Sequence, residues 1–295
     1  MRPLAFAVPL VIVAFALSRG IQRVLTALTL DELGPWSVSA ISLVMACGLW
    51  FPLAATKDWL VWNRRLWVRF IPLGLVNIAI PAVAFIASQQ FVSASIAALL
   101  VAAMPLVIAV FAAVLLGDRL RWPAVTGIVI GATGVVALTL GRGGALDASN
   151  WWLGVGLIAV GVVAAASVYV GWRGLLAEYS GVKILAPQLA VAAVAVLPLA
   201  VIFEGWAVPS VPVVAGLVAL SIVNYVVPQL AMFWLLARTT AVRSSVANYL
   251  APLFATLIAV PVLGQQITAL ILLGGALIVT GAVLINTARL LNKER

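Results

Sequence analysis

The sequence predicts an all-α integral membrane protein with ten transmembrane helices, arranged as two inverted five-helix repeats around a central cavity. Three observations predict this fold. Of the 295 residues, 65% are apolar and only 8% are charged, whereas an ordinary soluble chain carries roughly 25% charged residues. The apolar residues gather in ten long runs, and the second half of the chain repeats the first. These features exclude a water-soluble globule.

The ten runs are each long enough to cross a bilayer, since a membrane helix needs about 20 mostly apolar residues. The first run carries Arg19 and Arg23 and lacks a small-residue cleavage site, so we interpret it as a retained helix and not as a signal peptide. No loop exceeds about 15 residues, so we expect no attached soluble domain. The runs lie at roughly 4 to 28, 36 to 55, 69 to 88, 93 to 115, 122 to 140, 151 to 172, 184 to 203, 211 to 236, 242 to 263 and 267 to 288.

Basic residues in the short loops predict the orientation, because Lys and Arg resist translocation while acidic residues matter little. With a cytoplasmic N-terminus, 14 of the 17 basic residues fall on the inner side and only Arg142 falls in an outer loop. We therefore expect a bacterial-type inner membrane protein with both termini cytoplasmic. The net charge of +9 follows from this bias, so no nucleic-acid partner is expected. The predicted outer loops carry the acidic residues Asp31, Glu32, Asp147 and Glu204.

The second half of the chain repeats the first at a constant offset of 147 residues. The segment NIAIP at 77–81 reappears as NYVVP at 224–228, and Gly127 matches Gly274. Apolar matches would mean little in this composition, but matches at Asn, Pro and Gly positions are informative. Because each half holds five helices, the second half is predicted to be inverted relative to the first. We expect one repeat over residues 1–145 and the other over 146–295, forming one integral unit.

Three segments carry a resemblance to a known family. They are SASIAALLVAAMPLVIAVFAAVLLGDRL at 93–120, the Gly-spaced GIVIGATGVVAL at 127–138, and the weaker copy of both at 240–285. They resemble the drug/metabolite transporter superfamily, in particular its EamA-type ten-helix exporters. The resemblance covers nearly the whole chain and is closest to the YddG-type exporters of aromatic and other amino acids.

The resemblance implies export of an amino acid or a related small zwitterion by alternating access between the repeats. The superfamily also contains carriers of other metabolites, so a carrier of a nucleobase, a sugar derivative or a neutral drug is an alternative, as is a non-transporting membrane scaffold. The acidic residue that many members carry after the fourth span is present as Asp118, but its repeat mate is Gln265. Ser42 stands in the second span, where many members carry a polar or basic residue.

Asparagine and proline recur together inside three predicted spans. Pro81 lies four residues after Asn77, Pro228 four residues after Asn224, and Pro252 four residues after Asn248. Proline cannot donate a backbone hydrogen bond, so each one leaves the carbonyl of its asparagine without the usual helical partner. At membrane depth, freed backbone groups are tolerated only where protein or a water-lined cavity satisfies them. Helix packing explains any one asparagine alone equally well, but the symmetric pair of Asn77 and Asn224 favours kinked helices at a central cavity.

Arg19 and Arg23 lie four residues apart on one face of the first run, with Ser18 and Gln22 beside them. The helical rise places Arg19 roughly 22 Å across the membrane, in the outer third. An arginine in hydrocarbon costs several kcal/mol, so each one either snorkels outward or faces a polar interior. We expect Ser18, Arg19 and Gln22 to line the cavity, with Arg19 attracting a carboxylate. Snorkelling is the alternative.

Other polar residues inside the spans complete the expected site. Tyr225 and Tyr249 offer a ring to apolar cargo and a hydroxyl to its polar end, and Ser244 lies one turn before Asn248. Helix packing is the alternative for each. The expected cavity and substrate-binding residues are Ser18, Arg19, Gln22, Asn77, Gln188, Asn224, Tyr225, Ser244, Asn248 and Tyr249, and the expected kink or gating residues are Pro81, Pro105, Pro228 and Pro252.

Three glycines, Gly127, Gly131 and Gly134, recur at helical spacing in one predicted span. No Lys-Ser or Lys-Thr pair follows them, so a phosphate-binding loop is not indicated. Small residues at this spacing let two membrane helices approach closely. We therefore expect a tight helix contact along this face.

Ionisable residues are scarce inside the predicted spans. None of the eight acidic residues lies plainly mid-span, the chain has no His, and Cys47 is its only Cys. Membrane proton carriers are commonly carboxylates or His, and a catalytic centre needs a cluster of such groups. We expect no enzyme activity, cofactor or metal. The expected partners are a small neutral or zwitterionic substrate, moved down its gradient or by exchange, and membrane lipid; a monomer is the working expectation.

Overall fold

The computed structural model describes residues 2–55, 64–116, 122–141, 150–179, 181–205, 208–238 and 241–290. Its regular elements are α-helices and two short π-helices. In chain order they are α1 (Arg2–Thr29), α2 (Pro35–Ala55), α3 (Arg64–Gly74), η1 (Leu75–Ala79), α4 (Ile80–Ser88), α5 (Ala94–Val101), α6 (Met104–Leu116), α7 (Trp122–Gly141), α8 (Trp151–Glu178), α9 (Gly181–Glu204), α10 (Val211–Ser221), η2 (Ile222–Val226), α11 (Val227–Arg238), α12 (Ala241–Leu263) and α13 (Ala269–Leu290).

The helices coincide with the predicted apolar runs. Among the described residues, five helices are long and apolar enough to cross a membrane, and five shorter apolar helices accompany them. The chain is thus an all-helical, multi-pass membrane protein. The five long segments are Ala7–Thr29, Trp67–Ser88, Trp151–Val168, Lys183–Glu204 and Val211–Met232.

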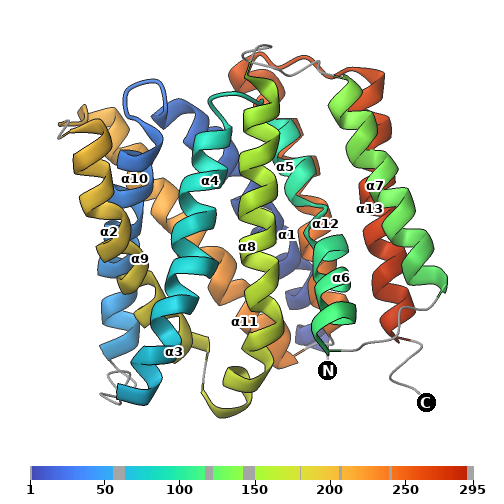
Figure 1. Cartoon of the computed structure of the whole chain (residues 1–295), viewed down its shortest axis with the longest axis horizontal. Helices are drawn as coiled ribbons and strands as arrows, with labels where there is room; N and C mark the ends of the chain where they lie inside the picture. The colour runs from blue at the N-terminus through green and yellow to red at the C-terminus, as the bar shows by residue number, and fades with distance from the viewer. Residues whose placement is uncertain are drawn as a thin grey trace.

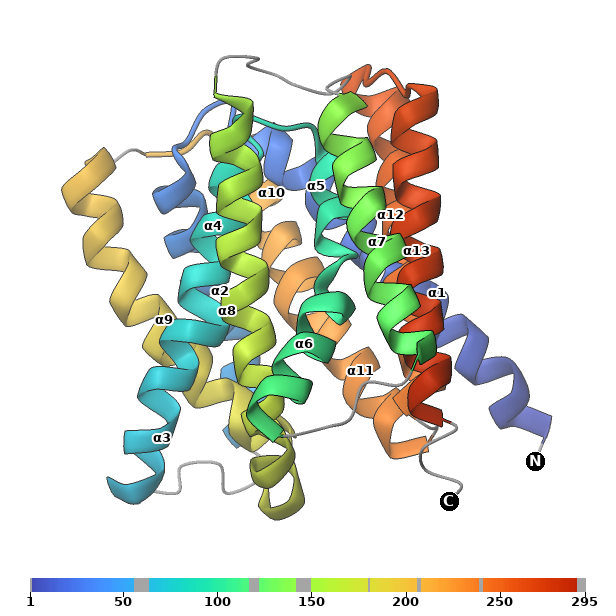
Figure 2. The ribbon, with the colours of Figure 1, turned by 45° about the vertical axis from the view of Figure 1, so that its right-hand side comes forward.

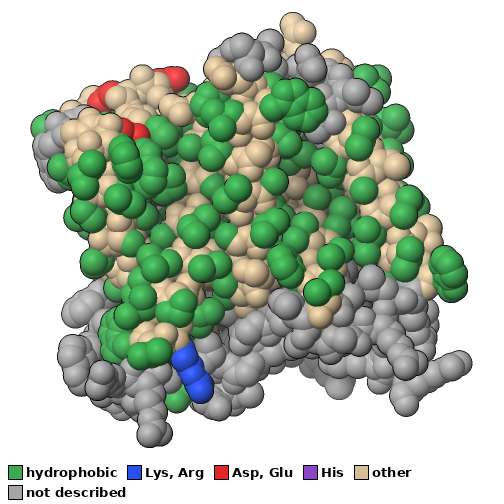
Figure 3. All heavy atoms as spheres, viewed as in Figure 1, with side chains coloured by type: hydrophobic (Ala, Val, Ile, Leu, Met, Phe, Trp, Pro, Cys, Tyr) green, Lys and Arg blue, Asp and Glu red, His purple; other side chains and the backbone are tan. Residues whose placement is uncertain are grey.

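The helices stand side by side in a bundle, and α1 begins at the same end of the bundle where α13 finishes (Figure 1 and Figure 2). Figure 3 shows a broad band of apolar side chains across the face of the bundle, with acidic side chains gathered at one end beside α2 and α10 and a basic side chain at the other end near α3. We call the end that carries Glu32 and Glu204 the acidic end. Charge is therefore confined to the ends of this face, as a bilayer requires.

The main helix contacts join the first half of the chain to the second. α1 packs against α11 and α12, α2 against α9, α4 against α8, and α7 against α13. In Figure 1, α7 and α13 lie along one another at one edge of the bundle. Two five-helix units standing next to each other would make mainly internal contacts, so the halves of this chain are interlocked.

The contact of α7 with α13 depends on glycine at matching positions. A Cβ atom on Gly134 would lie 2.7 Å from the carbonyl oxygen of Gly274, and a Cβ atom on Gly281 would lie 2.4 Å from the carbonyl oxygen of Gly127. Real side chains do not approach a backbone this closely, so both positions need Gly. The expected tight contact along the glycine face is confirmed.

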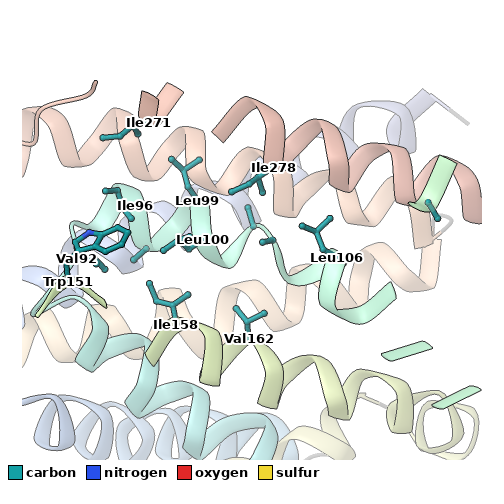
Figure 4. Packing of buried hydrophobic residues seen from close by; sticks show 14 residues of the cluster. Val92, Ile96, Leu99, Leu100, Leu106, Trp151, Ile158, Val162, Ile271 and Ile278 are labelled. Atoms are coloured by element: carbon teal, nitrogen blue, oxygen red, sulfur yellow. The ribbon is translucent and has the colours of Figure 1, made fainter. Parts of the chain in front are cut away.

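One cluster of buried apolar residues joins α5 to α8 and α13 (Figure 4). Leu100 of α5 lies toward Ile158 of α8, Ile96 lies beside Trp151, and Leu99 lies toward Ile278 of α13. Lipid is as apolar as these side chains, so the cluster stabilises the bundle through close van der Waals fit and not through removal of apolar surface from water.

The two π-helices lie immediately before the repeat-related prolines. η1 precedes Pro81 and η2 precedes Pro228, and their bounds differ by the repeat offset. In each, the backbone N–H before the proline donates five residues back, from Ile80 to the Leu75 oxygen and from Val227 to the Ile222 oxygen. A proline in an α-helix would clash with the carbonyl four residues earlier. The wider π turn relieves that clash while the helix continues.

The other predicted kink positions differ from each other. Pro105 lies in the first turn of α6, after a turn at residues 102–103 that separates α5 from α6. Its repeat mate Pro252 lies inside the continuous helix α12. The two copies of this span therefore do not have the same backbone.

Candidate functional site

Arg19 and Asn224 form a polar contact between α1 and η2 in the interior of the bundle. The Arg19 Nη1 atom donates to Asn224 Oδ1 at 2.9 Å and to Gln22 Oε1 at 3.1 Å. Gln22 and Asn224 are both buried. Arg19 thus lies against other polar side chains in the protein. Its guanidinium keeps further N–H groups in addition to Nη1, since an arginine offers five donors.

Asn77 and Gln188 form a second polar contact, between η1 and α9. The Asn77 Nδ2 atom donates to Gln188 Oε1 at 3.2 Å, and the Nε2 atom of the fully buried Gln188 has no partner within the described structure. Gly74 lets the two segments come together, because a Cβ atom there would lie 2.9 Å from the Gln188 carbonyl oxygen. An unpartnered amide N–H next to a weak amide pair is a donor that a ligand could use.

The Asn77–Gln188 and Arg19–Asn224 contacts involve repeat-related asparagines but differ in the chemistry of the partner. η1 packs against α8 and α9, whereas η2 packs against α1 and α2. Each repeat-related asparagine therefore reaches a helix of the other half. Asn77 donates a hydrogen bond to the neutral amide of Gln188, whereas Asn224 accepts one from the cation of Arg19. The arrangement supplies amide donors and acceptors near one fixed positive charge.

Tyr225 lies next to Asn224 and is buried. Its backbone oxygen accepts a hydrogen bond from Trp50 Nε1 at 3.2 Å, and its hydroxyl has no partner in the described part of the chain. Sequence reasoning missed Trp50. The available signal was an indole N–H inside an apolar run, since a buried indole N–H usually finds an acceptor.

Other predicted site residues are placed as follows. The Ser18 hydroxyl donates to the Phe15 carbonyl oxygen at 2.7 Å, so its proton is used within α1. Pro81, Pro228 and Pro252 are buried. The side chains of four predicted residues lie outside the described part of the structure: Pro105, Ser244, Asn248 and Tyr249.

At the acidic end, two carboxylates cap helices of the opposite half. Glu204, at the end of α9, accepts hydrogen bonds from the backbone N–H groups of Trp36 at 2.9 Å and Ser37 at 2.8 Å, in the first turn of α2. Glu32 accepts from the backbone N–H and the hydroxyl of Ser210, immediately before α10. Hydrogen bonds from the Ser210 hydroxyl and backbone hold the pKa of Glu32 below its ordinary value of 4.5.

A third connection at this end joins Gln265 to α5. Gln265 Oε1 accepts from the Ser95 hydroxyl at 2.8 Å and from the Ser95 backbone N–H at 3.3 Å. Sequence reasoning treated Glu32 and Glu204 as topological markers only and Gln265 as a departure from the family pattern. These residues cap helix ends that lie far away in the sequence, so their capping role could not be predicted from a local sequence pattern.

Metal-dependent or acid–base chemistry has no cluster to support it among the described residues. No group of three or more His, Cys, Asp or Glu side chains lies close enough there to hold a metal ion. The polar groups of the Arg19–Asn224 and Asn77–Gln188 contacts are amides and a guanidinium group. Such groups are suited to binding a polar molecule.

Comparisons with known proteins agree with a transport site. The sequence pattern of the EamA-like transporter family matches residues 7–140 and again residues 152–287. A protein of Streptantibioticus cattleyicolor, described as a probable terminal-alkyne amino-acid exporter, is 27% identical over 264 residues, which cover 88% of this chain and 84% of that protein. An uncharacterized transporter of Archaeoglobus fulgidus is 21% identical over 252 residues, covering 83% of this chain and 89% of that one.

A solved structure, described only as the crystal structure of a protein, has the same fold. It superposes with a TM-score of 0.69 at 21% identity and covers 98% of both chains. At this identity the likeness shows the fold alone.

Proposed function

Because this chain belongs to the EamA-like transporter family, we propose that it exports an amino acid or a related small zwitterionic metabolite. Family membership makes the chain a transporter of a small molecule and not an enzyme. The relative described as an amino-acid exporter supports the cargo class. The observation that carries the proposal is the interior contact of Arg19 with Asn224, which places a cation beside amide groups in an otherwise apolar bundle.

The residues divide the binding of a zwitterion between them. Arg19 attracts the carboxylate through its N–H groups that remain available beyond Nη1. Asn77 and Asn224 offer amide oxygens to the ammonium group, and the unpartnered Nε2 of Gln188 and hydroxyl of Tyr225 supply further polar contacts. Apolar walls accept the side chain of the cargo. Ser18, Gln22, Ser244, Asn248 and Tyr249 complete the proposed cavity.

Alternating access between two inverted five-helix repeats, residues 1–145 and 146–295, is the proposed mechanism. It is supported by the common offset of η1 and η2 and by the reciprocal packing of each half on the other. The π-helices at Pro81 and Pro228, together with Pro105 and Pro252, are the proposed points of flexing, because π turns and prolines interrupt regular helical bonding.

The proposed topology has ten membrane-spanning helices and both termini on the cytoplasmic side of an inner membrane. The acidic end of the bundle is then the outer end. The segregation of acidic and basic side chains supports this orientation (Figure 3). In this arrangement, the caps that Glu32, Glu204 and Gln265 form close the outer ends of helices from opposite halves.

Counterflow with purified protein in liposomes tests the function. Vesicles loaded with unlabelled leucine, phenylalanine, uracil or glucose receive the matching labelled compound outside, with and without an imposed pH gradient. Counterflow of the amino acids alone is the expected result. Counterflow of uracil or glucose alone would assign the chain to another cargo class, and no counterflow of any compound would favour a scaffold.

Arg19→Gln tests the proposed carboxylate contact, and Arg69→Gln is its matched control because Arg69 is exposed on α3. We expect a raised KM for amino acids in the first variant and wild-type behaviour in the second. Unchanged affinity and rate in Arg19→Gln would exclude that role.

A further inference from the structure

Arg23 is a buried cation that the proposed site does not use. It lies one turn after Arg19 on α1, closer to the acidic end, and only 5% of it is exposed. Its Nη1 atom has no hydrogen-bond partner within the described structure. The side chain of Arg23 therefore lies inside the bundle. Burial of a charge is costly unless a counter-charge or hydrogen bonds compensate it, so the unpartnered Nη1 is a donor that suits an anion.

The carboxylates at the acidic end are engaged elsewhere. Glu204 accepts from the first turn of α2, and Glu32 accepts from Ser210. Arg19, the neighbouring charge on α1, repels the Arg23 guanidinium and adds to the positive potential there. The chain thus presents two cations one turn apart in its interior, while these two carboxylates serve as helix caps.

The aromatic ring beneath Arg23 is held in a fixed place. The Arg23 guanidinium carbon lies 5.4 Å from the centre of the Phe85 ring on α4. The other side of Phe85 packs on α8, where a Cβ atom on Gly161 would lie 2.4 Å from the ring. A cation over a ring gains about 0.5–2 kcal/mol. Stacking on a ring face leaves the N–H groups at the guanidinium edge available for an anion.

Gln89 adds a second unpartnered polar group beside this ring. It follows Phe85 by one turn of α4 and is 3% exposed, and neither its Nε2 nor its Oε1 has a partner within the described residues. Val24, the neighbour of Arg23, packs with Ala94 at the start of α5. Arg23 contacts α4 through Phe85, its neighbour Val24 contacts the start of α5, and Gln89 caps the end of α4. Burial of an amide without partners is unfavourable, and a ligand that hydrogen-bonds to it would remove that cost.

We propose that Arg23 and Gln89, with Phe85 as platform, form a second carboxylate subsite one turn beyond Arg19. The carboxylate accepts hydrogen bonds from Arg23 Nη1 and Gln89 Nε2 and neutralises the guanidinium charge. This inference rests on the proposed export of a zwitterion. The subsite would be an additional binding position for the cargo between Arg19 and the acidic end. Transfer from Arg19 to Arg23 moves the carboxylate about 6 Å along α1.

Acetate binding tests the subsite without any transport. The full chain in detergent is heated with sodium acetate, with acetamide or with sodium chloride, and the unfolding temperature is recorded. Acetate is expected to raise the unfolding temperature of the wild type and of Arg69→Gln, whereas acetamide is not. The shift is expected to fall in Arg23→Gln to the part that the proposed carboxylate contact of Arg19 contributes, and Arg19→Gln is expected to keep the part that Arg23 contributes. An equal acetate shift in Arg23→Gln would overturn the proposal, and an equal shift from chloride would overturn the assignment to a carboxylate.

Gln89→Glu supplies a second variant that does not remove the arginine. Its new carboxylate is expected to occupy the subsite from within the chain, raise the unfolding temperature without ligand and lower the acetate shift to the part that Arg19 contributes. A Gln89→Glu protein that keeps the full acetate shift would contradict the proposal. Gln90→Glu is the matched control, because Gln90 is exposed at the same helix end.

Counterflow then separates this inference from the proposed function. If wild-type protein moves amino acids, Arg23→Gln and Gln89→Glu are expected to lower the rate about tenfold or more, with partial recovery in Arg23→Lys. Wild-type rates in both variants would overturn the subsite and leave amino-acid export intact. Failure of the wild type to move amino acids would refute the proposed function, while the acetate shift would still decide the subsite.

Discussion

Asn224→Ala is expected to impair transport much more than Asn77→Ala, although the two asparagines are repeat mates. The structure gives them different partners. Asn224 Oδ1 holds the Arg19 guanidinium at 2.9 Å, whereas Asn77 Nδ2 donates to the Gln188 amide at 3.2 Å. Truncation of Asn224 leaves the half-buried Arg19 guanidinium without one of its acceptors, while truncation of Asn77 disturbs only two neutral amides.

The expected magnitudes follow from the bond types. A hydrogen bond to a charged group contributes about 1.5–3 kcal/mol, and one between neutral groups about 0.5–1.5 kcal/mol. Since about 1.4 kcal/mol corresponds to a factor of ten, Asn224→Ala is expected to lower kcat/KM by roughly 10- to 150-fold. The corresponding loss for Asn77→Ala is roughly 2- to 12-fold.

Counterflow of labelled amino acid in proteoliposomes measures both variants at several substrate concentrations, with equal protein incorporation established on gels. Gln90→Ala, at an exposed amide, is expected to match the wild type. Equal losses in Asn77→Ala and Asn224→Ala, or a larger loss in Asn77→Ala, would refute the reasoning, because the asymmetry comes directly from the charged partner. Full activity in both variants would place the binding site elsewhere.

Three further outcomes concern stability. Gly281→Ala places a Cβ atom 2.4 Å from a backbone oxygen of α7, so unfolding by denaturant should show a loss of about 1–3 kcal/mol; Gly156→Ala, which meets open space, is the control, and equal effects would contradict the packing argument. The bonds from Ser210 lower the pKa of Glu32, so its contribution is present above pH 4.5 and is lost as the pH falls through the lower folded-state pKa. Unfolding temperatures of wild type and Glu32→Gln should therefore converge in acid, and a constant difference would rule this out. Trp50→Phe removes the indole donor to η2 and should cost about 0.5–1.5 kcal/mol in unfolding free energy, an expectation that an unchanged value would refute.

The helical elements could be predicted from the sequence because their causes are local. Apolar runs near bilayer length fix where helices form, and the spacing of Asn77 and Pro81 marks a helix whose backbone bonding must change. The sequence did not predict whether the helix would bend or widen into a π turn at these prolines. The expected kink is a π-helix in both copies, and the decision between a kink and a wider turn depends on how the neighbouring helices pack.

The site was predicted in part. Gln22, Asn77, Gln188, Asn224 and Tyr225 are indeed buried or half-buried polar residues, which their place in apolar runs indicates. Trp50, Phe85 and Gln89 escaped notice because their roles depend on contacts across helix interfaces and not on spacing along one helix.

By itself, the sequence determined that the chain is helical and lies in a membrane, and the family pattern in both halves determined that it is a transporter. Only the tertiary structure decided which polar groups meet. Asn77 pairs with a residue 111 positions away and Arg19 with one 205 positions away. Arg23 lies over the Phe85 ring, and its Nη1 atom has no hydrogen-bond partner among the described residues. Helix formation is governed by neighbours along the chain, whereas the partner of a side chain depends on which helix faces come together.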